Sequence, residues 1–346
     1  MLTQPLDEFI TLMPKVELHL HLEGTITPRT LIDLAERNGV SLPAHDEESV
    51  AALFRYRDFG EFLSVFMGLA RAMVRGEDFE RLAYELGLDL AAQSVRYAEV
   101  MISPMQHITR GVDLYEAIAG AMAGFARAER EAGTVVRLAL DYGRGYGTEA
   151  AWAVLEVARA ARPLGVVGWS IGGQEIGHPP EPFAPHFAAA HKAGLGLMAH
   201  AGEVVGPASV WGAVEALGCT RLGHGIRSVD DPALLAMLVA RGVVLDVCPT
   251  SNLLTGAVGS WEQHPLRRLR EAGVAVTLNS DDPTFFHTTL TEEYRRAATH
   301  FGFGADELCD AVLTAARASF LPPAARAALC QRLDSELAAL RARIGV

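Results

Sequence analysis

The chain has 346 residues, of which 50% are hydrophobic and 21% charged, as is ordinary for a soluble globular protein. Its formal net charge is −12 and its only lysines are Lys15 and Lys192, so we expect no nucleic-acid partner. The four cysteines lie too far apart to indicate a disulfide framework or a zinc ribbon, and neither a signal peptide nor a bilayer-spanning run is present, so we expect a cytoplasmic protein without a membrane partner.

Residues 1–14 are predicted to form a short helix, and residues 16–22 a β-strand that carries His19 and His21. Side chains two residues apart leave the same face of a strand, so both imidazoles would face one point. This arrangement is a natural start for a metal site, but an ordinary half-buried strand could also carry two histidines. The remaining ligands must come from elsewhere in the chain.

Residues 29–38 are predicted to form a helix, with a proline at its start and a glycine just after its end. Residues 45–75 are also predicted to be helical and are rich in large apolar side chains. Phe62, Phe66 and Leu69 recur on one helix face. That face could be ordinary core, or it could be an apolar lid over a pocket.

Short β-rich segments alternate with long helical segments through the rest of the chain. After the first strand, the predicted strands are residues 95–102, 135–142, 166–171, 196–200, 221–223, 243–247 and 274–278. Alternation of this kind indicates a parallel sheet with crossover helices, and eight units favour a closed (β/α)8 barrel of the TIM type. We therefore predict a single α/β domain over residues 1–346, with extra helices in residues 305–346 outside the barrel.

Polar residues are concentrated at the carboxyl ends of the predicted strands, whereas the strand bodies are almost wholly apolar. Besides the first strand, the polar ends are His200-Ala-Gly-Glu203, Gly223-His-Gly225, Cys248-Pro-Thr-Ser-Asn252 and Asn279-Ser-Asp-Asp-Pro283. Barrels of this type build their active sites from these strand ends and the loops that follow them. The sequence therefore predicts one site at the top of the barrel.

The residue types at these ends indicate a catalytic zinc site. Three neutral imidazoles and one carboxylate suit Zn²⁺, so we predict that one zinc ion per chain is bound by His19, His21, His200 and Asp281. A catalytic zinc keeps one position for water and makes hydroxide available near neutral pH.

Three further residues are predicted to act beside the metal. Glu203 could be a proton shuttle, His224 could hold the attacking hydroxide or accept its proton, and Asp282 could point to the substrate. Alternatively, the two aspartates before Pro283 could form a plain turn, and His224 could be a core histidine. The other histidines are predicted to lie on the surface or in loops: His45, His107, His178, His186, His191, His264, His287 and His300.

These motifs resemble those of the adenosine deaminase family of metal-dependent hydrolases. The matching segments follow the family's order over residues 15–285 and are Glu17-Leu-His-Leu-His-Leu-Glu-Gly24 together with the four polar ends given above. The resemblance implies a (β/α)8 barrel with one zinc ion. It also implies hydrolytic replacement of an amino group on a purine-like ring, with a small purine nucleoside as the partner. The oligomeric state stays open.

The resemblance also implies a role for each matching residue. The same four residues match the zinc ligands, Glu203 matches the acid that protonates the ring nitrogen, and His224 matches the residue that orients the hydroxide. Asp282 matches a hydrogen bond to the ring. The residues implied to contact the substrate are His21, Glu23, Gly173, Asp282 and the apolar lid of Phe59, Phe62 and Phe66.

The substrate within the family is less closely defined. Residues 254–258 and 288–294 resemble the adenosine branch, whereas residues 177–180 resemble adenine deaminases. Glu23 stands where vertebrate adenosine deaminases place an aspartate near the ribose. We therefore expect adenosine, deoxyadenosine or a 5′-modified adenosine such as 6-aminodeoxyfutalosine, and adenine as the alternative.

Three other kinds of protein share some of these features. Relatives with other amidohydrolase activities often use two metals bridged by a modified lysine, but neither Lys15 nor Lys192 ends a predicted strand. The zinc deaminases of the H-x-E and P-C-x-x-C pattern are excluded, because no P-C-x-x-C is present. A barrel retained as a binding or signalling protein is the third interpretation, and the intact ligand set and Glu203 argue against it.

Overall fold

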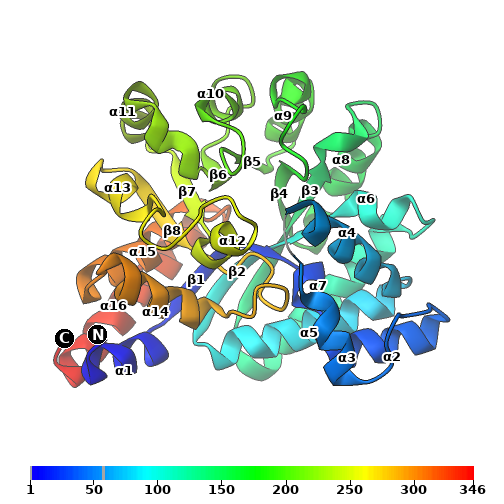
Figure 1. Cartoon of the computed structure of the whole chain (residues 1–346), viewed down its shortest axis with the longest axis horizontal. Helices are drawn as coiled ribbons and strands as arrows, with labels where there is room; N and C mark the ends of the chain where they lie inside the picture. Colours follow the sequence, from blue (N-terminus) through cyan, green and yellow to red (C-terminus); the bar gives the residue numbers. More distant parts are fainter. Residues whose placement is uncertain (1, 57–58) are drawn as a thin grey trace.

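The computed structural model describes residues 2–56 and 59–346, and its centre is a ring of parallel strands (Figure 1). In this described part, the strands are β1 (Lys15–His21), β2 (Val95–Ile102), β3 (Val135–Gly143), β4 (Val166–Gly172), β5 (Gly196–Ala201), β6 (Arg221–His224), β7 (Val244–Val247) and β8 (Ala275–Leu278). Each strand pairs in parallel with the next one along the chain, in the order β1 to β8. The predicted (β/α)8 barrel is therefore confirmed.

The ring closes between β1 and the segment that follows β8. The backbone N–H of His21 donates to the carbonyl oxygen of Asp281 at 2.9 Å, and the N–H of Asp281 donates to the carbonyl oxygen of His19 at 3.1 Å. Leu20 and Asp281 form an isolated parallel bridge there. Closure therefore places the first and last predicted metal ligands, His19 and Asp281, side by side, although they lie near opposite ends of the chain.

Helices surround the strands. Their bounds are α1 (Gln4–Leu12), α2 (Pro28–Asn38), α3 (Glu47–Ala51), α4 (Phe59–Leu69), α5 (Gly76–Ala92), α6 (Pro104–Ile108), α7 (Leu114–Ala132), α8 (Ala151–Ala160), α9 (Ala184–Lys192), α10 (Pro207–Glu215), α11 (Pro232–Arg241), α12 (Pro249–Leu254), α13 (Leu266–Glu271), α14 (Leu290–Phe301), α15 (Ala305–Ala318) and α16 (Pro323–Ile344). Pro28 begins α2 after the Thr27 cap, and Gly39 ends it in a left-handed conformation, as predicted.

The prediction of one helical stretch over residues 45–75 is wrong in part. The stretch is divided into α3, the 3₁₀ turns Ala52–Phe54 and Ala70–Ala72, and α4. Arg55 has an extended backbone, with φ −100° and ψ 135°, and this conformation ends the first of those turns. The division lets α4 lie over the ring of strands in the view of Figure 1.

The prediction of almost wholly apolar strand bodies is also wrong in part. Three strands contribute a buried ion network: the Arg221 guanidinium lies 2.7 Å from Glu99 and 2.8 Å from Asp246. The phenyl ring of Phe320 stacks on Arg221, with 4.0 Å between the guanidinium carbon and the ring centroid. The sequence did not indicate this network, because each of the three strands contributes only one of its charged residues.

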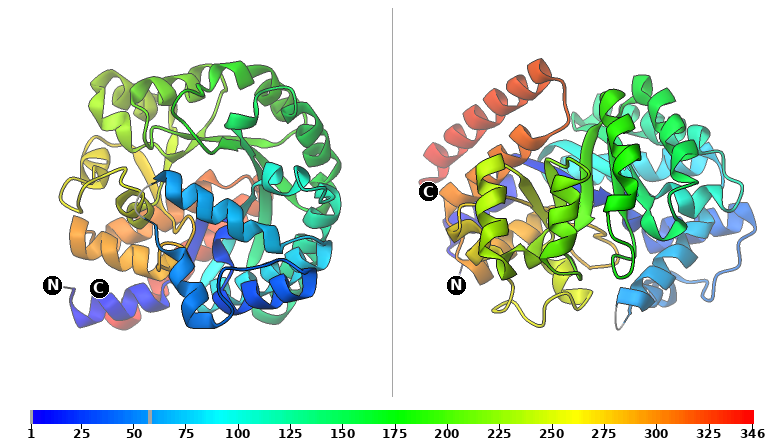
Figure 2. Two further views of the ribbon diagram at one scale, coloured as in Figure 1. Left: turned by 45° about the vertical axis from the view of Figure 1, so that its right-hand side comes forward. Right: turned by 90° about the horizontal axis from the view of Figure 1, so that it is seen from above.

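The chain ends lie together outside the barrel. Helix α16 packs on α15, and α1 contacts α16, as the two views of Figure 2 show. Within the described residues, none of the helices has the length and hydropathy needed to span a bilayer.

Candidate active site

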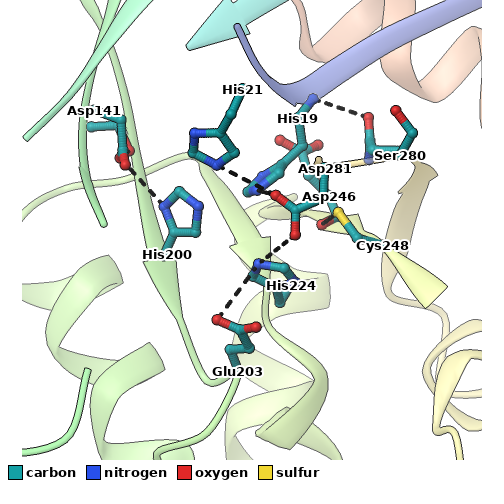
Figure 3. A network of polar contacts seen from close by, with 12 residues as sticks. His19, His21, Asp141, His200, Glu203, His224, Asp246, Cys248, Ser280 and Asp281 are labelled. Carbon is teal, nitrogen blue, oxygen red and sulfur yellow. Dashed lines mark hydrogen bonds and ion pairs between the residues drawn. The ribbon is translucent and has the colours of Figure 1, made fainter. Parts of the chain in front are cut away.

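The predicted metal ligands lie together at the carboxyl ends of β1 and β5 and in the turn after β8 (Figure 3). The Nε2 atoms of His19 and His21 lie 3.3 and 3.4 Å from the same Asp281 oxygen. The rings of His19 and His200 have centroids 4.6 Å apart. Four residues from three separate segments of the chain therefore surround one point.

The donor set fits a metal ion. Ligand atoms of His19, His200, His224 and Asp281 all lie within 4.8 Å of one another, and His21 joins overlapping groups with His200 and with Asp281. Both ring nitrogens of His19 are buried without a hydrogen bond of normal geometry among the described residues, and Nε2 has only the ion-pair contact with Asp281. Because buried polar groups are normally paired, these nitrogens indicate a missing electrophilic partner.

Glycines allow the close approach of these side chains. A Cβ atom on Gly223 would lie 2.4 Å from the His19 ring, and a Cβ atom on Gly24 would lie 2.0 Å from an Asp282 oxygen. Both positions therefore need glycine for steric reasons, and both belong to the motifs found in the sequence.

His224 and Asp281 have strained backbones. Their φ angles are 62° and 64°, in the left-handed region that non-glycine residues rarely adopt. Residues held there cluster at functional sites, because the surrounding structure must offset the cost. The His224 ring faces the cluster, where its Nε2 atom lies 3.7 Å from Glu203 and 3.8 Å from Asp281.

Glu203 lies in the loop after β5. The carboxylate of Glu175 binds the backbone of this loop. Glu175 accepts hydrogen bonds from the backbone N–H groups of Gly202 at 2.6 Å, Val204 at 2.9 Å and Val205 at 2.9 Å. Burial raises the pKa of Glu203 well above its ordinary value, and the negative charges of Asp281 and Glu175 raise it further. The raised pKa favours the protonated form of Glu203.

A cavity with about 670 Å³ of empty space, part of it open to solvent, lies above the cluster. The predicted site residues that line it are His21, Phe62, Phe66, Gly173, His200, Glu203, His224, Asp281 and Asp282. Phe66 packs edge-on to His21, with ring centroids 6.4 Å apart. Phe59 begins α4, but its side chain lies outside the described part of the chain.

Glu23 does not line this cavity among the described residues. It is buried behind the cavity wall, where one carboxylate oxygen lies 2.7 Å from Nε2 of His107 and accepts the backbone N–H of Ser103 at 2.9 Å. Its position fixes the start of α6, which contributes Met105 and Gln106 to the cavity.

Asp141 belongs to the site but was not predicted from the sequence. Asp141, at the end of β3, lines the cavity, accepts a hydrogen bond from Ser170 at 2.6 Å and lies 3.4 Å from Nδ1 of His200. Its position near the carboxyl end of a predicted strand could have identified it as a site residue. The prediction that all remaining histidines lie on the surface or in loops is wrong for His107 and His186, which are buried in α6 and α9, whereas His264 lies in a loop as predicted but is buried there.

A (β/α)8 barrel with a histidine–aspartate cluster and a buried acid at the carboxyl ends of its strands defines the class of metal-dependent hydrolases. Comparisons with known proteins make the assignment more specific. The sequence profile of the adenosine deaminase family matches residues 14–336, so the chain belongs to the adenosine deaminase family. It is therefore a hydrolase that acts on carbon–nitrogen bonds.

Relatives with described activities cover nearly the whole chain. Aminodeoxyfutalosine deaminase from Streptomyces avermitilis is 40% identical over 339 residues, which cover 96% of this chain and 94% of the relative. Adenine deaminase from Rhodospirillum rubrum is 39% identical over 325 residues, which cover 94% of this chain and 97% of the relative.

Two solved structures share the fold. Adenine deaminase from Arthrobacter aurescens matches with a TM-score of 0.88 and 32% identity, over 93% of this chain and 98% of that one. A zinc-bound amidohydrolase from Burkholderia ambifaria matches with a TM-score of 0.92 and 30% identity, over 100% of this chain and 96% of that one.

Proposed function

We propose that this protein catalyses the zinc-dependent hydrolytic deamination of a 6-aminopurine nucleoside and releases ammonia. The observation that carries the proposal is that the histidine–aspartate cluster and the buried acid Glu203 face one cavity, which Phe62 and Phe66 also line. His19, His21, His200 and Asp281 would hold the metal. A zinc ion bound there would lower the pKa of water and so supply the nucleophile near neutral pH.

Glu203 is the proposed acid. Because burial raises its pKa and so favours the protonated form, Glu203 can donate a proton to the ring nitrogen next to the amino-bearing carbon. Protonation makes that carbon a better electrophile. His224 lies 3.7 Å from Glu203 and faces the same side of the cavity, where it can hold the attacking oxygen.

Asp282, Gly173 and the α4 phenylalanines are proposed to bind the ring. The Oδ1 atom of Asp282 is buried without a partner among the described residues, and burial raises the pKa of this carboxyl group. It is therefore available to hydrogen-bond a ring nitrogen. Phe62 and Phe66 provide the apolar surface that a flat heterocycle requires, and they exclude water from the reacting carbon.

The substrate is proposed to be adenosine, deoxyadenosine or a 5′-modified adenosine such as aminodeoxyfutalosine, because relatives with that last activity are 40% identical over most of the chain. Adenine is the alternative, since adenine deaminases are 36% to 39% identical. In a 6-aminopurine, the amino carbon and N9 lie at opposite ends of the ring system. With the amino group at the metal, the N9 substituent would therefore face the cavity mouth. The carboxylate of Glu23 is engaged with His107.

A panel assay tests the proposal. Purified zinc-loaded protein is incubated with adenosine, deoxyadenosine, adenine and aminodeoxyfutalosine, and ammonia release and purine absorbance are followed. We expect turnover of at least one nucleoside, whereas turnover of adenine alone would favour the alternative. If no 6-aminopurine releases ammonia, the proposal is wrong, and about two metals per chain would instead favour another amidohydrolase activity. We also propose a cytoplasmic role in purine salvage, with no nucleic acid as partner.

A further inference from the structure

Behind His224, a chain of hydrogen bonds leads away from the cavity through Asn252 to His264. Nδ1 of His224 lies 3.0 Å from Nδ2 of Asn252, and Oδ1 of Asn252 lies 3.2 Å from Nε2 of His264. The chain ends at the backbone of Leu266, whose N–H donates to Nδ1 of His264 at 3.1 Å. All three side chains are buried, so these partners replace water.

The backbone amide sets the direction of every bond in this chain, because it can only donate. Nδ1 of His264 must therefore accept. Burial lowers the pKa of His264 to about 4, so the ring is neutral at pH 7 and its single proton is on Nε2. That N–H donates to Oδ1 of Asn252, which leaves the amide nitrogen of Asn252 facing His224.

The opposite orientation of the Asn252 amide is excluded. It would place the NH₂ group against the Nε2–H of His264, so that two donors would face each other. With the observed orientation, Nδ1 of His224 accepts a hydrogen bond from Asn252. The proton of a neutral His224 ring is then on Nε2, the atom that faces Glu203 and Asp281.

We propose that Asn252 and His264 are positioning residues that hold His224 in the Nε2–H tautomer, so that His224 donates a hydrogen bond to the attacking oxygen and does not act as a base. This inference rests on the proposed function and decides between the two roles that the sequence left open for His224. In the overall reaction, the water oxygen bonds to the amino-bearing carbon, and the carbon–nitrogen bond breaks with its electron pair on nitrogen. One proton of the water ends on the ring nitrogen and the other on the departing ammonia. His224 loses no proton in this reaction.

Asn252→Asp is the decisive variant. An aspartate of nearly the same shape accepts from His264 as before, but it can only accept from His224 and so requires the proton on Nδ1. The lone pair on Nε2 would then face the attacking oxygen. We expect kcat to fall about 10³-fold or more with zinc content unchanged, comparable to the loss when a triad histidine has the wrong tautomer. If His224 were a base, the added carboxylate would increase its basicity, and activity would be retained or raised. That result would overturn the proposal.

A pair of His264 variants separates tautomer control from packing. His264→Leu removes the donor to Asn252, so that the amide can turn, and we expect kcat to fall about 10-fold. His264→Gln supplies an amide N–H in its place, and we expect it to recover most of that loss. Equal losses in both variants would assign the effect to packing and contradict the proposal.

Nuclear magnetic resonance of ¹⁵N-labelled histidine side chains tests the tautomer without any turnover. In the metal-free wild-type protein, we expect the His224 proton on Nε2, and in Asn252→Asp on Nδ1. A wild-type His224 with its proton on Nδ1 would overturn the inference. A wild-type protein that shows the Nε2–H tautomer but deaminates no purine would instead contradict the proposed function.

Discussion

Glu175 accepts the backbone N–H of Gly202 at 2.6 Å and thereby ties the loop after β4 to the loop that carries Glu203. Its second carboxylate oxygen accepts two further N–H groups from that loop, at 2.9 Å each. The proton donor of the proposed reaction is thus placed by a residue that does not line the cavity among the described residues.

Glu175→Gln is predicted to lower kcat about 10- to 100-fold, because its amide nitrogen cannot accept and the Glu203 loop loses at least one bond. We expect KM to change less than 3-fold and zinc to stay bound. Steady-state kinetics with metal analysis checks this prediction, and the exposed Glu156→Gln variant is the matched control. Unchanged kcat in Glu175→Gln would contradict the positioning role.

Glu203→Gln is predicted to abolish measurable turnover, a loss of about 10²- to 10⁴-fold, because the amide has no acid proton to give to the ring. Zinc content and binding of a purine product should persist, since Glu203 is not one of the proposed ligands. Full activity in this variant would exclude the assigned role.

Asp141→Asn is predicted to weaken zinc binding about 10- to 100-fold, because a carboxylate beside a ligand histidine orients the ring and increases its basicity. Asp141 lies 3.4 Å from Nδ1 of His200 and is held there by Ser170. Competition with a chromogenic chelator measures the affinity. Ser170→Ala, which keeps the carboxylate, should show a smaller effect in the same direction.

Phe66→Ala is predicted to raise KM about 10-fold with less change in kcat, because the ring contributes apolar contact to bound and reacting purine alike. Phe66 is 7% exposed and lies against His21. Met67→Ala, on the same helix but 41% exposed, is the control and should leave both constants near the wild-type values. A rise in KM of the same size in both variants would assign the effect to the helix as a whole.

Lys15→Met is predicted to flatten the pH dependence of stability. Lys15 is buried at the start of β1, and burial lowers its pKa from 10.5 to about 7. Between these values the unfolded chain binds the proton and the folded chain does not, so the free energy of unfolding of the wild type rises with pH. Relative to the methionine variant, the rise should approach about 1.4 kcal/mol per pH unit above pH 7. Urea unfolding at pH 7, 8 and 9 measures it, and parallel curves would refute the prediction.

The barrel and the ligand types could be predicted from the sequence because both depend on local pattern. Alternation of β-rich and helical segments is repeated along the chain, and His19 and His21 share a strand face by periodicity alone. The motif glycines, such as Gly223, also lie within short segments, since each leaves room for one neighbouring side chain.

The pairs that the sequence could not indicate are formed between elements far apart in the chain. His264 was expected on the surface or in a loop, and nothing near it in sequence shows that this loop residue is buried and hydrogen-bonded to Asn252. Asp141 and Glu175 bind groups on other strands or loops, His200 and the backbone of Gly202, so their own sequence context did not indicate their roles. Glu23 was expected at the substrate, yet in the folded chain its carboxylate is bound to His107.

The sequence by itself thus determined the fold class, the proposed metal ligands and the acid, because strand periodicity and residue chemistry are local properties. Only the tertiary structure decided which way each side chain faces, which buried groups are paired and where the His224 proton lies. Those properties depend on burial and on hydrogen-bond partners that closure of the barrel brings together, and a linear pattern contains neither.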